Sequence, residues 1–161
     1  MQYYCIFAIV LFMSAVRKIK LSELSGFSKD TSFLSIVERK APQGYNKFFK
    51  KLIENQIKIN NKVFKKSSIQ DVNKILQKNI SPDLINSIFY KVWIKDIAKV
   101  IRAFSDTIGE TSVILTLETS RSCSRYHIDN VPMRLLVTYY GKGTEWFPNH
   151  ACDYSAYYSG E

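Results

Sequence analysis

The stretch Cys123–Trp146, CSRYHIDNVPMRLLVTYYGKGTEW, is the part around which the rest of the chain is organised. It joins a cysteine, a His-Ile-Asp triplet, a proline, an apolar segment and a glycine-rich turn. In an extended segment, side chains two positions apart emerge on the same face. His127 and Asp129 can therefore reach one ion together, and they are the main candidate metal ligands of the chain.

A histidine and a carboxylate supply two of the three ligands in the two-His-one-carboxylate triad that binds non-haem iron. The third ligand must come from elsewhere. His150 is one candidate, because a hairpin through Gly141–Gly143 can bring the two strand ends together. Cys123 is another, and as a soft ligand it would favour zinc. Cys123 is also compatible with a thiolate nucleophile beside His127, or with a small buried apolar side chain.

The alternative for the triplet is a structural role, in which Asp129 caps a turn before Pro132 and His127 makes a buried hydrogen bond. Arg125 and Arg134 flank the triplet, and a guanidinium can bind a carboxylate through two parallel hydrogen bonds. Arg134 is therefore the candidate cofactor-binding residue, with an edge-facing charge at the start of a strand as its alternative.

Length and composition indicate a globular protein. The chain has 161 residues, of which 46% are hydrophobic and 23% charged, with a formal net charge of +9. Residues 1–100 hold 18 Lys and Arg against 7 Asp and Glu, whereas residues 101–161 hold 5 against 7. The positive charge thus lies away from the triplet, and its spread among Ile and Asn is typical of solvated helix faces.

The chain has three cysteines without CxxC spacing, Cys5, Cys123 and Cys152. Neither a disulfide framework nor a zinc ribbon is therefore indicated, and we expect a cytoplasmic protein. Residues 3–16 form an apolar run with a basic flank at 17–20. A spanning helix needs about 20 apolar residues. We expect a buried or loosely attached element, with membrane association and an atypical start of the reading frame as alternatives.

Apolar spacing predicts helices over Tyr45–Ile59 and Ser68–Gln77, and a long one from Ser81 to Phe104. Ser81, Pro82 and Asp83 are a cap, a first-turn proline and an acid that complements the helix dipole. Residues 21–44 are expected to be loops around a short apolar piece at 33–37.

Alternation predicts strands at Ser112–Leu117, Met133–Tyr140 and Thr144–Phe147, with a turn at 141–143. The predicted fold class is α+β, with helices over 45–105 followed by antiparallel strands over 111–161. We expect an apolar N-terminal segment at 1–20 and a single domain at 21–161.

The residues from about 93 onward resemble the bacterial domain of unknown function 1826 family. The matching pieces are WIKDIAKVIRAF at 93–104, CSRYHIDNVPMRLLVTYYGKGTEW at 123–146 and FPNHACDYSAY at 147–157. The resemblance implies an oxygenase-like double-stranded β-helix, or jelly-roll, with His127 and Asp129 as the first two iron ligands. It also implies Fe(II) and 2-oxoglutarate as cofactors, and a later segment in which a His is closely followed by an Arg.

The chain ends at Glu161 before such a segment, and His150 is its only other histidine. We therefore interpret it as a C-terminally truncated, incomplete jelly-roll, whose exposed strand edges would favour self-association. The leading hypothesis is a metal-binding, Fe(II)-dependent dioxygenase-like protein acting on an unidentified small molecule. The alternatives are a non-catalytic remnant or binding module, and a lysine-rich nucleic-acid-binding protein. The charge distribution argues against binding of nucleic acid. The shortness of the apolar run argues against association with a membrane.

Overall fold

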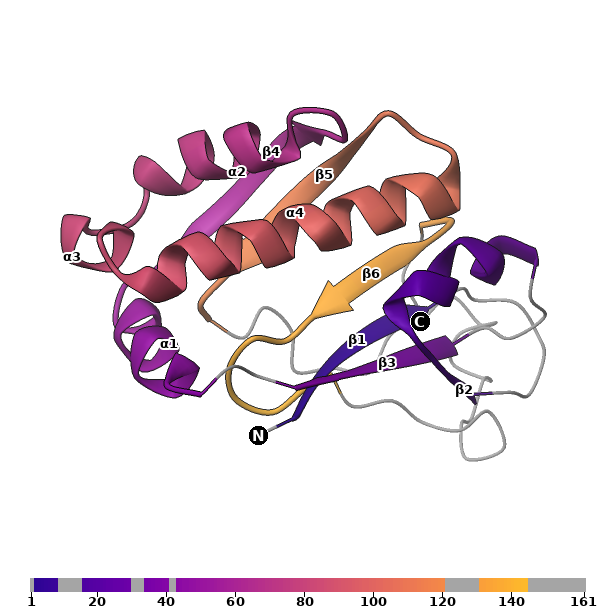
Figure 1. The fold of residues 1–161 in the computed structure, drawn as a ribbon, viewed down its shortest axis with the longest axis horizontal. Coiled ribbons are helices and arrows are strands. Elements are labelled where there is room, and N and C mark those ends of the chain that lie inside the picture. Colours follow the sequence, from indigo (N-terminus) through magenta and orange to yellow (C-terminus); the bar gives the residue numbers. More distant parts are fainter. Residues whose placement is uncertain (1, 9–15, 30–33, 41–42, 121–130, 145–161) are drawn as a thin grey trace, which may run out of the picture.

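The computed structural model describes residues 2–8, 16–29, 34–40, 43–120 and 131–144, with the side chains of residues 2–17, 28–29 and 40 left out. These residues form six strands in two sheets, together with four α-helices and one 3-10 helix (Figure 1). The fold class is α+β, as the sequence predicts. The predicted order of helices before strands is wrong, because three strands precede the first α-helix.

The larger sheet has the strand order β2-β3-β1-β6. Strand β1 (Gln2–Ala8) lies between β3 (Leu34–Lys40) and β6 (Arg134–Val137) and is antiparallel to both. Strand β2 (Val16–Ile19) is parallel to β3. The first half of the apolar N-terminal run is therefore a strand with backbone partners on both sides. Among the described residues, no helix is long and apolar enough to cross a membrane.

The smaller sheet pairs β4 (Lys58–Phe64) antiparallel with β5 (Ser112–Glu118). The predicted strand at 112–117 is confirmed, but the predicted helix over 45–59 is wrong beyond its first half. Helix α1 (Tyr45–Ile53) ends before residues 55–57, and the chain then continues into β4. Ile57 lies four positions after Ile53 and so continues the helical spacing, although it directly precedes β4 and is buried together with Ile59 of that strand.

The helix predicted at Ser68–Gln77 is confirmed as α2, with the same bounds. The long helix predicted from Ser81 is divided into α3 (Pro82–Ile85) and α4 (Ile88–Ile108). Ser87 causes the division: its backbone is extended, and its hydroxyl accepts a hydrogen bond from the Phe89 N–H at 3.3 Å, which caps a new helix.

Two parts of the segment predicted to be loop between 21 and 44 form regular elements. The 3-10 helix η1 (Leu21–Lys29) buries Leu24 and Phe27, and β3 follows it. At the other end, β6 stops at Val137, earlier than predicted, and the chain bends from Tyr139 to Gly141. The third predicted strand lies mostly outside the described residues.

Helix α4 contacts both hydrophobic clusters that the described residues form. Its first part contributes Trp93, Ile97 and Ile101 to the larger cluster, which also contains side chains of α1, α2, β4 and β5. Near its end, Phe104 packs on the smaller cluster, whose buried residues come from β2, η1 and β3 and against which β6 also packs. The position of this helix therefore sets the position of the larger sheet relative to α1 and α2.

The surroundings of Gly44, which precedes α1, show how tightly α1 and α4 are packed. Its φ is +86°, and an added Cβ would lie 2.7 Å from the Phe89 ring. Gly109, which ends α4, has a φ of +72° but no neighbour within 4 Å. We expect Gly44→Ala to lower the free energy of unfolding by about 1 kcal/mol more than Gly109→Ala does, because only the first adds a clash to the backbone strain. Urea denaturation of both variants measures the difference, and equal losses would contradict the packing of Phe89 on this turn.

Candidate functional site

Most of the residues that the sequence singles out lie outside the described part of the chain. This applies to His127, Asp129 and Cys123, and also to Arg125 and His150. Their roles as metal ligands or flanking charges stay predictions. In the described ranges alone, no three His, Cys, Asp or Glu side chains lie close enough together to hold a metal ion.

Arg134 is the one predicted site residue that the structure places. It is the first residue of β6, is exposed, and is in register with Ala8 of β1. The expected strand start at this position is confirmed to within one residue. Its role in binding a cofactor stays a prediction.

A different group of polar residues joins three elements of the fold. Asp96 of α4 accepts hydrogen bonds on both carboxylate oxygens: Arg39 Nη1 of β3 lies 2.7 Å from Oδ1, and the Tyr139 hydroxyl after β6 lies 2.7 Å from Oδ2. The Arg39 guanidinium carbon is 5.9 Å from the centre of the Tyr139 ring, within range of a cation–π interaction. The side chains of Arg39 and Asp96 are only 16% and 30% exposed, so this ion pair is screened less than a surface pair.

Aromatic packing holds the Tyr139 ring in place. It stacks on Phe49 with ring centres 5.4 Å apart and lies edge-on to Trp93 at 5.9 Å. Trp93 and Asp96 are three positions apart on α4, hence on neighbouring turns of one face. The aromatic cluster and the carboxylate therefore fix the two ends of the same tyrosine.

Burial of the Tyr139 phenol and the nearby negative charge of Asp96 raise its pKa well above the ordinary value of 10.0, and the Arg39 charge opposes this only in part. At neutral pH Tyr139 is consequently a neutral donor to a carboxylate. A neutral phenol can position Asp96 by donating a hydrogen bond, but it is not activated as a nucleophile.

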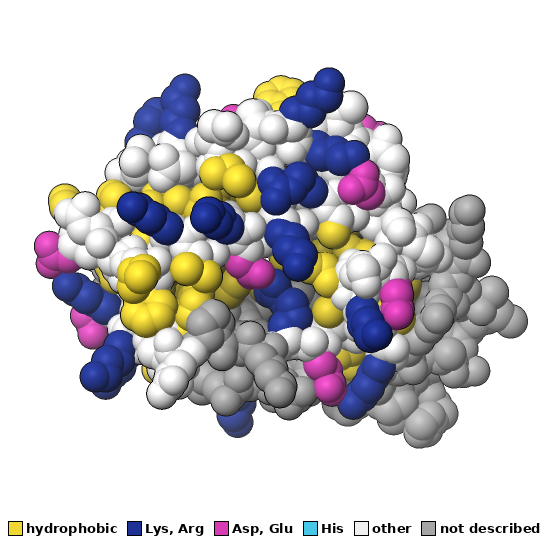
Figure 2. Space-filling view, viewed as in Figure 1, with side chains coloured by type: hydrophobic (Ala, Val, Ile, Leu, Met, Phe, Trp, Pro, Cys, Tyr) yellow, Lys and Arg dark blue, Asp and Glu magenta, His cyan; other side chains and the backbone are white. Residues whose placement is uncertain are grey.

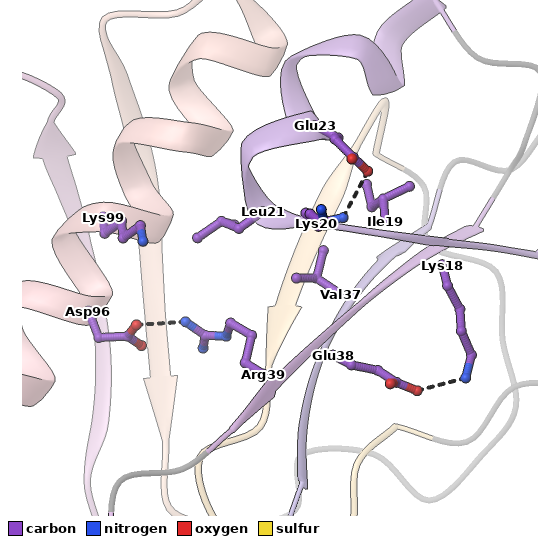
Figure 3. A pocket seen from close by; sticks show the side chains of 10 residues that line it. All are labelled: Lys18, Ile19, Lys20, Leu21, Glu23, Val37, Glu38, Arg39, Asp96 and Lys99. Atoms are coloured by element: carbon purple, nitrogen blue, oxygen red, sulfur yellow. Dashed lines mark hydrogen bonds and ion pairs between the residues drawn. The ribbon is translucent and has the colours of Figure 1, made fainter.

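A pocket of about 620 Å³ lies beside this contact (Figure 3). The end of β2, the start of η1, β3 and α4 line it, with Lys18, Ile19, Lys20, Leu21, Glu23, Val37, Glu38, Arg39, Asp96 and Lys99. Its volume is in the range of small-molecule sites. Four basic and three acidic side chains are among the ten that line it.

Positive charge extends from the pocket along α4. Lys91, Lys95 and Lys99 are exposed and recur every four residues, which places them along one side of the helix. On the face shown in Figure 2, Lys and Arg side chains predominate over Asp and Glu, with hydrophobic side chains between them. The exposed hydrophobic residues of α4 are Ile88 and Val92.

Sequence reasoning missed the Arg39–Asp96–Tyr139 contact. One signal was present: Asp96 interrupts the apolar stripe of the best-specified helix, and a carboxylate beside a buried stripe calls for a partner. The partners come from 57 positions before and 43 positions after it, and spacing along the chain does not reveal such pairs.

The described residues thus define an α+β protein in which one long helix contacts two hydrophobic clusters beside a charged pocket. The family model described as "Protein of unknown function (DUF1826)" matches residues 19–159, and the chain belongs to this family. The resemblance seen in the sequence is confirmed at the level of the family. A comparison with curated proteins found no match, and neither did a comparison with solved structures.

Removing the Asp96 carboxylate should destabilise the fold more than removing either of its hydrogen bonds. We expect Asp96→Ala to lower the free energy of unfolding by about 2–4 kcal/mol, because it leaves the Arg39 charge largely buried without this carboxylate. Tyr139→Phe should cost about 1–2 kcal/mol. Asp83→Ala is the control, since its pair with Lys51 is exposed and should be worth under about 1 kcal/mol. Urea denaturation gives all three values, and equal losses for Asp96→Ala and Asp83→Ala would contradict the role of the contact.

The raised pKa of Tyr139 predicts a specific loss of stability in alkali. A folded-state pKa above the unfolded value contributes stability that is present below about pH 10 and is lost as the pH rises towards the folded pKa. The stability advantage of the wild type over Tyr139→Phe should therefore shrink above pH 10, because only the wild type releases this proton on unfolding. Urea denaturation of both proteins at pH 8, 10 and 11 measures the difference; a constant advantage would argue against burial of this phenol.

Proposed function

We propose that the chain is an oxygenase-like protein that binds a divalent metal ion through His127 and Asp129. The observation that carries the proposal is the spacing of a histidine and a carboxylate two positions apart, directly before a strand. In an extended segment this spacing puts both side chains on one face. Membership of the family is compatible with the proposal, although the description of the family assigns no function.

The donor chemistry of the pair fits a ferrous ion. A neutral imidazole and a carboxylate are two members of the facial triad of non-haem iron proteins. When bound, such an ion supplies one-electron and dioxygen chemistry to an organic substrate. For the third ligand, His150 would favour iron, whereas Cys123 would favour zinc.

The place of β6 supports a role for Arg134 in the same proposal. The strand begins at Arg134, five positions after Asp129, and pairs with β1. A guanidinium at the start of this strand can hold a carboxylate through two hydrogen bonds, and 2-oxoglutarate offers two carboxylates. Arg134 would then position a co-substrate near the ion.

The jelly-roll part of the proposal applies to β1, β3 and β6. These three strands are antiparallel neighbours, as in one sheet of a jelly-roll. The parallel pairing of β2 with β3 and the packing of α4 on the clusters are additions to that pattern. We propose an oxygenase-like sheet embedded in an α+β fold.

Metal binding is tested by anaerobic titration of the purified chain with Fe(II), followed by metal analysis after desalting. We expect one ion per chain, and a loss of affinity of at least about 10-fold in both His127→Ala and Asp129→Ala, because each removes a ligand. Asp83→Ala is the matched control, as it removes an exposed carboxylate that pairs with Lys51. Circular dichroism checks that the variants remain folded.

The remaining ligand is assigned by two further variants in the same titration. Loss of Fe(II) binding in His150→Ala, with Fe(II) binding retained in Cys123→Ala, would identify His150 as the third ligand. Unchanged Fe(II) uptake in both His127→Ala and Asp129→Ala would sink the proposal and leave the triplet its structural role in a turn.

The lysines of α4 support a second candidate, binding of nucleic acid. Lys91, Lys95 and Lys99 lie on one side of the helix and could approach successive phosphates. We place this candidate second, because a row of lysines is more often a solvated helix face.

A further inference from the structure

We propose that the pocket between β3, η1 and α4 binds a small organic anion, with Lys20 and Lys99 holding its acidic group. The proposal is independent of the metal pair, since it uses none of the same residues. It rests on three features of the pocket: two lysine ammonium groups without a nearby carboxylate, an apolar lining, and a rigid side.

Some charged side chains of the pocket form ion pairs, and others do not. Of its three carboxylates, Glu38 pairs with Lys18 at 2.7 Å and Asp96 pairs with Arg39 at 2.7 Å. The third, Glu23, accepts a hydrogen bond from the backbone N–H of Lys20 at 3.0 Å and so caps the start of η1. Within the described residues, the ammonium groups of Lys20 and Lys99 have no carboxylate within 4.0 Å.

The two ammonium groups come from different elements. Lys99 is on α4, and Lys20 directly precedes η1; in Figure 3 they lie on opposite sides of Leu21. Two cations that face one pocket repel each other, and an anion between them removes the repulsion. A carboxylate or a phosphate has enough oxygen atoms to accept hydrogen bonds from both.

Leu21 lies between the two cations in Figure 3 and is half-buried, so it offers apolar surface to a ligand. Val37 and Ile19 also line the pocket but are only 1% and 9% exposed. A ligand with a hydrocarbon body can cover Leu21 while its acidic group meets the lysines. A pocket of about 620 Å³ holds such a molecule and exceeds what a bare inorganic ion needs.

One side of the pocket is fixed before a ligand arrives. The Arg39–Asp96 pair joins β3 to α4, and Tyr139 holds the other oxygen of Asp96. Lys99 lies three positions after Asp96, so its backbone is held by the same helix turn. A preorganised wall loses less conformational entropy on binding than a mobile one. The ligand class is therefore a small carboxylic acid or phosphate ester with an apolar body.

The test is isothermal titration calorimetry in EDTA with two probes, benzoate and phenyl phosphate. We expect saturable 1:1 binding of at least one probe with a Kd of about 1 mM or tighter. Lys20→Gln and Lys99→Gln should each weaken it about 5- to 10-fold, because each removes one charged donor. The probe that binds more tightly identifies the acidic group as carboxylate or phosphate.

Lys91→Gln is the matched control, because it removes the same charge from an exposed position of α4 two turns before Lys99, outside the pocket. It should change the Kd less than about 2-fold, since exposed charges farther apart than about 10 Å are largely screened in 0.1 M salt. Lys99→Arg should retain binding, which separates loss of charge from loss of fold.

Two results would overturn the proposal: no saturable binding of either probe up to about 10 mM, or equal weakening by Lys91→Gln and Lys99→Gln. Asp129→Ala should bind the probes as the wild type does. Failure of the metal proposal and failure of this one are therefore distinguishable.

Discussion

The burial of α4 between two hydrophobic clusters is the constraint on which the rest of the fold depends. Trp93, at 1% exposure, packs edge-on against Phe48, Phe49 and Tyr139 in the first cluster, and Phe104 packs on the second. Within the described residues the smaller sheet has only two strands, and a two-stranded sheet needs packing against another element to be stable. Helix α4 supplies apolar surface to this sheet and to the larger one.

The hydrogen bonds of Asp96 orient α4 within this packing. Hydrophobic burial is non-directional, so it holds α4 on the sheet without setting the rotation of the helix about its axis. The two hydrogen bonds of Asp96, to Arg39 and to Tyr139, set that rotation. The same rotation keeps Lys91, Lys95 and Lys99 on one exposed side of the helix, and of the three only Lys99 lies far enough along α4 to line the pocket.

The sequence predicted those helices and strands whose spacing or capping residues lie within one continuous segment. The bounds of α2 and the core of β5 follow from spacing and alternation. The helix start at Ser81–Pro82 was also predicted, although the Ser81 side chain does not make the predicted capping hydrogen bond. The division of the long helix at Ser87 was missed because its apolar stripe continues across the break. Strand β4 was missed for a similar reason, because Ile57, directly before it, continues the helical spacing of α1. The pocket and the Asp96 contact depend on pairs from distant segments, which spacing does not reveal, and the predicted His127–Asp129 pair falls outside the described residues.

The central place of β1 has a consequence for how the chain acquires its fold during synthesis. Cys5 of β1 is in register with Val37 of β3 and with Val137 of β6. The first pairing becomes available early, but the second must wait until β6, more than a hundred residues after β1, has been made. Until then an apolar strand keeps one open backbone edge, and contacts this distant in sequence form slowly. The nascent chain is therefore exposed to edge-to-edge association until β6 is synthesised, and pairing with β6 ends that period.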